Sequence, residues 1–133
     1  MPQVTGIMTT NVETRPVEMA TDLSAKQYYF VTLDAAVDNR VALAVAGTVI
    51  AFPLIDGKDG SVNVAEGSIA VSGQTKIILN ATIAAGVPVM PDGGGKAVAA
   101  TDGKYFSGVT MQAGVAGDLV LMDVCHGVYK TVS

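Results

Sequence analysis

The sequence predicts an all-β fold, a small single-domain β-barrel of residues 26–133 that follows an extended N-terminal arm of residues 1–25. Half of the 133 residues are hydrophobic, and most of these are small, with 20 Val and 18 Ala against 7 aromatic residues. Such a composition is typical of short, closely packed strands. Turn signals rich in Gly and Asp recur about every 8–12 residues, as in sandwiches and barrels. No window of ten or more residues has the apolar spacing of an amphipathic helix.

The first 25 residues contain no aromatic residue and little regular periodicity. Pro16 favours an extended conformation of Arg15, and a short helical turn fits residues 17–23. Two interpretations stay open: a frayed terminus, or an arm that becomes ordered on a partner. An extended arm of this length would reach up to ~80 Å. Its apolar side chains suit strand addition to an exposed sheet edge, which makes candidate binding residues of Val4, Ile7, Met8, Val12, Val17 and Met19.

From residue 26 onward, runs rich in β-branched residues alternate with turns. The expected turns lie at residues 38–39, 46–48, 56–60, 66–67, 72–73, 91–95, 102–103 and 117–118. Between them we expect strands at residues 28–33, 41–45, 49–55, 68–72, 76–81, 87–89, 97–100, 105–112, 119–124 and 128–132. Because side chains alternate between the two faces of a strand, we expect the barrel to enclose Leu43, Ile77, Leu79 and Leu121.

Charge and hydropathy exclude several classes of protein. The net charge is −4 and no two basic residues adjoin, so the chain lacks the basic stripe that nucleic-acid binding needs. The single Cys125 cannot form an internal disulfide, and the N-terminus has no secretory signal pattern. The longest apolar stretch, residues 41–55, is interrupted by Gly47 and Pro53 and is shorter than the ~20 residues of a spanning helix. We therefore expect neither nucleic acid nor a membrane as a partner.

The residues that could carry chemistry form no recognisable site. Cys125 and His126 are the only cysteine and histidine, and adjacent strand residues point to opposite faces, so they cannot act as a nucleophile and base pair. One Cys and one His are too few for a zinc site. Asp118 and Asp123 would face opposite ways on a strand, and no general acid–base pair is evident. The sequence therefore predicts no catalytic residue, no metal site, no cofactor and no enzymatic activity.

Two glycine-rich segments resemble ligand loops only superficially. Residues 56–60 hold two aspartates, but Lys58 between them opposes a cation, so a polar turn is expected rather than a calcium loop. Residues 91–97 lack the first glycine and the hydroxyl residue of a phosphate-binding loop, since Met90 and Ala97 stand at those positions. We interpret this segment as a flexible hairpin tip.

An ordered series of short segments between residues 27 and 124 resembles the small capsid decoration, or cement, proteins of tailed bacteriophages. The segment at residues 51–60 and the first 25 residues depart from the family pattern. The resemblance is carried by QYYFVTL at 27–33, RVALA at 40–44, GQTKI at 73–77, IAAGVPV at 83–89, GKAVAA at 95–100, YFSGV at 105–109 and AGDLV at 116–120.

This resemblance implies a β-tulip-like barrel on the outer surface of a virion, made in the bacterial host cytoplasm. It implies binding to the major capsid protein of a tailed phage, as homotrimers at three-fold and quasi-three-fold positions, and stabilisation of the head. It brings no catalytic residue and no cofactor. In this context a capsid or a neighbouring subunit becomes the expected partner of the N-terminal arm.

Two other functions stay open at the level of sequence. One is a head-fibre or tail-associated structural protein on the same scaffold. The other is a biotinyl- or lipoyl-type carrier domain, which needs a lysine at a hairpin tip in a context such as Met-Lys-Met or Asp-Lys-Ala. Lys58 and Lys96 lie in turns, but neither has such neighbours.

Overall fold

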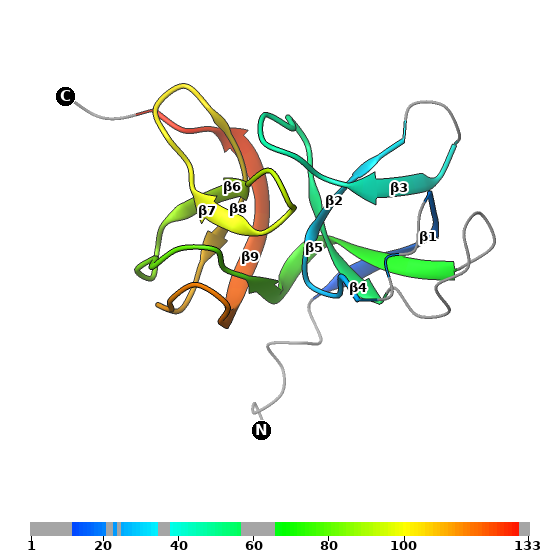
Figure 1. Ribbon diagram of the computed structural model, residues 1–133, viewed down its shortest axis with the longest axis horizontal. Coiled ribbons are helices and arrows are strands. Elements are labelled where there is room, and N and C mark those ends of the chain that lie inside the picture. The colour runs from blue at the N-terminus through cyan, green and yellow to red at the C-terminus, as the bar shows by residue number, and fades with distance from the viewer. Residues whose placement is uncertain (1–11, 21–22, 24, 35–37, 57–65, 131–133) are drawn as a thin grey trace.

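The computed structural model describes residues 12–20, 23, 25–34, 38–56 and 66–130 (Figure 1). Strands and turns make up this part of the chain, which confirms the predicted all-β, barrel-like fold. The nine strands are β1 (Glu13–Met19), β2 (Phe30–Leu33), β3 (Arg40–Leu43), β4 (Phe52–Asp56), β5 (Glu66–Ile78), β6 (Pro88–Pro91), β7 (Ala97–Ala99), β8 (Tyr105–Thr110) and β9 (Leu119–Val128).

The first half of the fold is a closed ring of five strands. Its order is β1-β3-β2-β4-β5. Because β1 also pairs with β5, the five strands close on themselves. The β1–β5 pairing is antiparallel, whereas β1 meets β3 in a short parallel pairing at Glu18 and Met19. We call this the first ring; it uses only residues 66–72 of β5.

The second half is a sheet that begins on the same strand. Residues 73–78 of β5 pair with β9, and the order continues through β8 and β6 to β7. A parallel bridge between Leu79 and Ala97 brings the start of β7 back beside the residue that follows β5. The second sheet therefore curls around its own core, at the other end of the molecule from the first ring (Figure 1).

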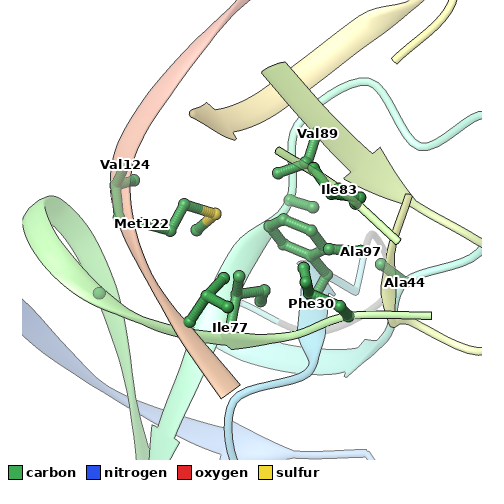
Figure 2. Close-up of a cluster of buried hydrophobic side chains, with 12 residues drawn as sticks. Phe30, Ala44, Ile77, Ile83, Val89, Ala97, Met122 and Val124 are labelled. Atoms are coloured by element: carbon green, nitrogen blue, oxygen red, sulfur yellow. The ribbon is translucent and has the colours of Figure 1, made fainter. Parts of the chain in front are cut away.

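Each half encloses its own hydrophobic core. The first core, inside the ring, consists of Val17, Met19, Leu23, Val31, Val41, Leu54 and Ile69. The second core surrounds the Phe30 ring, which Figure 2 shows between Ile77 on β5 and the side chains of Ile83, Val89 and Ala97. Met122 and Val124 close it from β9. Burial of these side chains is the main source of stability that the fold offers.

Strands β2 and β5 form walls that the two cores share. Phe30 faces the second core and its neighbour Val31 faces the first, and both are fully buried. On β5, Ile69 and Ala70 divide in the same way. These strands therefore bury both faces, so their sequences are apolar at consecutive positions instead of alternating with polar residues.

The hairpin between β6 and β7 joins the two halves at its glycine-rich turn. Asp92 accepts hydrogen bonds from the backbone N–H groups of Gly94 and Lys96, at 2.8 and 3.0 Å, which fixes the turn. Gly95 has a φ of +83° and its carbonyl accepts the N–H of Phe30 at 2.7 Å. The hairpin predicted at residues 91–95 is confirmed, and its turn is held against β2 by these hydrogen bonds.

The predicted core is correct in part. Ile77 and Leu79 are fully buried, as expected, and Leu43 is partly buried against the first core. The prediction for Leu121 was wrong, because Val120 and Met122 on either side of it face inward and leave Leu121 only partly buried on the outer face. Four consecutive apolar residues, 119–122, gave no alternation from which to choose the inner face.

Several predicted boundaries were also wrong. Residues 17–19 belong to β1 and do not form a helical turn. The strand expected from residue 28 begins at Phe30, since Tyr28 has a positive φ of 67°. The turn expected at residues 72–73 is a bend inside β5, where Gly73 has a φ of 92°. Strand β9 runs without a break through residues 125–127 and ends at Val128, so it shares only this residue with the strand expected at 128–132.

Replacement of Leu79 by Ala is expected to lower the free energy of unfolding by about 2–5 kcal/mol, because a fully buried leucine would leave a cavity in the second core. Leu119→Ala is the matched control, since Leu119 is 48% exposed, and it should change stability by less than about 0.5 kcal/mol. Urea denaturation measures both. A loss below about 1 kcal/mol for Leu79→Ala would contradict its place in the core.

Replacement of Gly95 by Ala is expected to cost more than replacement of Gly103 by Ala. Both glycines have a φ near +80°, so both variants pay the left-handed strain of about 1–2 kcal/mol. Only at Gly95 would the new Cβ lie 2.7 Å from Leu43 Cδ1 and 3.0 Å from the Phe30 carbonyl oxygen. This crowding should add about 1–3 kcal/mol. Equal thermal and urea stabilities of the two variants would show that the turn does not press on β2.

Candidate interaction surfaces

The predicted N-terminal binding residues fall into three groups. Val4, Ile7 and Met8 lie outside the described residues. Val12 is partly buried and packs against the second core. Val17 and Met19 lie on β1 and are 3% and 0% exposed, inside the first core. The latter two side chains would become available to a partner only if β1 left the ring.

Side-chain hydrogen bonds and an ion pair hold strand β1 in the first ring, in addition to its backbone pairing with β3 and β5. Arg40 Nη2 lies 2.8 Å from Glu18 Oε1, and Arg40 Nε donates to the same oxygen at 2.9 Å. Asn39, held at a φ of +63°, donates from Nδ2 to the Pro16 carbonyl. At the other end Ser72 Oγ donates to Glu13 Oε1 at 2.6 Å. These bonds link β1 to both strands that flank it.

A groove of about 410 Å³ opens beside β1 on the first ring. Its walls are mostly apolar, with Leu33 the most exposed of them at 54%. Arg15 and Asn39 supply its polar lining. The groove follows the inner row of β1, β4 and β5 side chains, so it is an extension of the first core toward solvent.

Eight other large hydrophobic side chains of the described residues are 43–53% exposed, and they lie at the two ends of the β8–β9 hairpin and in the loop between β3 and β4. At the open end, a hollow of about 300 Å³ lies between the loop at residues 46–49 and residues 103–105, with Met90 in its wall. We call the exposed residues around it the hollow patch. They are Val49 and Tyr105 in its wall, Val45 next to the lining residue Ala46, and Val128, which pairs with Tyr105. The neighbouring Ile50 is also half exposed.

At the closed end of the hairpin, the turn at residues 111–118 presents a second apolar group, which we call the turn patch and which consists of Met111, Val115 and Leu119. The Met111 N–H donates to the Leu121 carbonyl at 2.7 Å, which ties the start of the turn to β9. Asp118 Oδ2 accepts the Val115 N–H at 2.9 Å and holds the tip in shape. The sequence analysis did not predict either patch, because it searched for periodic apolar runs. Single apolar residues among turn residues are the feature that could have indicated them.

Cys125 and His126 are neighbours on β9, where successive side chains alternate between the two faces. His126 Nε2 lies 2.7 Å from the Ala51 carbonyl oxygen, and its ring meets the Phe52 ring edge to face at 5.2 Å. Cys125 is partly buried. Burial raises the pKa of the Cys125 thiol, and the nearby Asp123 carboxylate raises it further. His126 therefore packs β9 against β4, and the raised pKa of Cys125 disfavours the reactive thiolate.

Two other polar candidates, Asp92 and Lys96, make local contacts within the fold. No group of three potential metal ligands occurs in the described ranges. Asp92 orders the β6–β7 turn, as above, and Lys96 Nζ lies 5.9 Å from the centre of the Tyr29 ring. Of the turn expected at residues 56–60, Asp56 is the last residue of β4, and the rest, Lys58 included, lies outside the described residues. No helix that is long and apolar enough to cross a membrane is found in the described part of the chain.

Comparisons with known proteins point to one fold. A scan of protein-family models found no match, and a search of curated proteins found none either. Among solved structures, the chain is similar to a crystal structure of the N base of head fiber gp8.5 in bacteriophage phi29. The TM-score is 0.61 and the sequence identity 13%, and the match covers 86% of this chain and 94% of that chain. The two proteins therefore share a fold over nearly their whole lengths.

The raised pKa of Cys125 is expected to appear in its alkylation by iodoacetamide. Because the thiolate is the reactive form, the pH midpoint of the rate should lie higher in the native protein than in the urea-unfolded chain. Asp123→Asn should lower the native midpoint, by less than unfolding does, since burial is the larger cause. Mass spectrometry of timed samples gives the rates. Coincident native and unfolded midpoints would contradict the described environment of the thiol.

Proposed function

We propose that this chain is a structural protein of a bacteriophage head, located on the outer surface of the virion. The observation that carries the proposal is the fold similarity to a phage head fiber base over 86% of this chain. The resemblance of residues 27–124 to capsid decoration proteins points to the same part of a virion. The acidic composition and the partly exposed apolar side chains at two ends of one hairpin suit a protein that acts through its surfaces.

Within this proposal the decoration role is the first specific form. The chain would bind the major capsid protein as homotrimers at three-fold and quasi-three-fold positions and stabilise the shell. Its small, rigid β-fold suits this role because three linked contacts bind far more tightly than one. In this form the protein would coat the whole shell, and its loss would lower the temperature at which heads release DNA.

The second form is the base of a head fibre, which the fold similarity favours directly. A fibre base needs a firm attachment to the shell and a continuation of chain, or a further protein, that projects outward. In this form the copies would be fewer and each would carry a projection. Both forms are non-enzymatic and need no cofactor, in keeping with the structural roles of Cys125, His126 and Asp92.

A biotinyl- or lipoyl-type carrier is the weaker alternative. Such a carrier presents its lysine freely at a hairpin tip, whereas Lys96 is partly buried and lies over the Tyr29 ring. An unmodified mass of the chain expressed in a host that lipoylates and biotinylates proteins would remove this alternative.

Cryo-electron microscopy of the virion that contains this protein tests the proposal. We expect density of this fold on the outside of the head, on most three-fold sites for a decoration protein or at sparse, projecting positions for a fibre base. A location inside the shell, in the tail, or nowhere in the particle would overturn the proposal. Isolated monomers on the shell, or dimers on its two-fold axes, would overturn the trimeric form.

Deletion of residues 2–11 is expected to weaken binding to heads while the domain stays folded. The deletion stops before β1, because Val17 and Met19 belong to the first core and their loss would disturb the ring itself. The matched control replaces Val4, Ile7 and Met8 with Ser at full length. Head binding is measured by co-sedimentation and folding by thermal melting. Unchanged affinity in both variants would show that the remainder of the chain carries the binding.

A further inference from the structure

The two apolar patches lie at opposite ends of the β8–β9 hairpin. Tyr105 lies opposite Val128 at the open end of the β8–β9 hairpin, and Thr110 lies opposite Met122 just before the turn. The six residues of β8 separate the two ends by about 20 Å. Figure 1 shows the loop between β3 and β4 near the first end and the turn between β8 and β9 at the other. The two patches are therefore too far apart for one side chain of a partner to cover both.

The two patches have complementary shapes. The hollow patch surrounds a concave space of about 300 Å³ whose wall includes Val49, Met90 and Tyr105. The turn patch is the tip of a hairpin, with Val115 about half exposed and held in place by Asp118. A hollow of that volume is large enough for one or two aliphatic side chains. The turn of another copy offers such side chains.

The charges beside the two patches are also complementary. Lys104 lines the hollow and is exposed, without an ion-pair partner in the described part of the chain. Asp102 in the same turn has an interaction of its own. At the turn patch the exposed charge is Asp118, whose Oδ2 holds the Val115 N–H. A copy that placed its turn in the hollow would bring an aspartate toward a lysine, which favours this partner over a second hollow patch.

We propose that the turn patch of one copy docks in the hollow patch of the next copy, so that the chain assembles head to tail. Such a contact joins two different surfaces, and it closes into a ring when the rotation between copies allows it. Each patch exposes only a few side chains, against about 800 Å² per partner in a standard interface, so a single contact is weak and ring closure supplies the avidity. The ring size of three rests on the proposed function; the contact itself does not.

Two variants separate this assembly from every symmetric alternative. Val49→Asp disables the hollow patch and leaves the turn patch intact, and Val115→Asp does the reverse. Each variant alone should be monomeric in sedimentation velocity, because every contact in the ring needs both patches. Mixed in equal amounts, they should form a one-to-one dimer and nothing larger, since only one intact pair of patches remains. Leu33→Asp, in the separate groove beside β1, is the matched control and should assemble like the original chain.

Native mass spectrometry and sedimentation up to about 1 mM protein cover contacts with a millimolar Kd. Melting temperatures of all variants confirm that each is folded. The inference is overturned if the original chain stays monomeric over this range, if either patch variant still assembles fully, or if the mixture gives no dimer. These measurements need no virion. If the patch variants contradict the head-to-tail contact, the proposed location on a phage head is still tested separately by electron microscopy of the virion. If the microscopy contradicts that location, the proposed contact between copies is unaffected.

Discussion

The fold depends on one constraint, that strands β2 and β5 each separate two hydrophobic cores. A wall of this kind must bury side chains on both faces, and the chain meets the requirement with Phe30 beside Val31 and Ile69 beside Ala70. Strand β5 is long enough, at 13 residues, to serve the first ring with its first half and the second sheet with its second half. Neither half could be removed without exposing an apolar face of the other.

The shared walls dictate where unusual backbone conformations occur. Strand β5 changes partners at Gly73, where a φ of 92° redirects it from β1 to β9. The start of β2 is bonded from both sides, because Tyr28 accepts the Ile78 N–H and donates to the Leu54 carbonyl. Its φ of 67° costs some strain. That strain is offset by two hydrogen bonds that tie the first ring to the second sheet at one residue.

The sequence predicted the class of fold, and two of the four core residues it named, Ile77 and Leu79, are fully buried; the reasons are local. Turn residues marked the loops, and β-branched runs marked the strands. The register failed at residues 119–122, where apolar residues follow one another, and β1 was missed because Val17 and Met19 alternate with Pro16 and Glu18 over too short a span. The division into two cores could not be foreseen, since it rests on contacts such as Phe30 with Gly95, distant in sequence.

The same limits apply to the candidate surfaces. The sequence singled out the N-terminal arm because its apolar residues had no visible place in a strand pattern, and two of them proved to have one inside the first ring. It passed over Val49 and Val115 because each stands alone among turn residues. A small domain rich in Val and Ala has few large apolar side chains, and most of them are needed in its cores. Where such side chains are nonetheless exposed in groups, at both ends of one hairpin, they are better accounted for by a neighbouring molecule than by the fold itself.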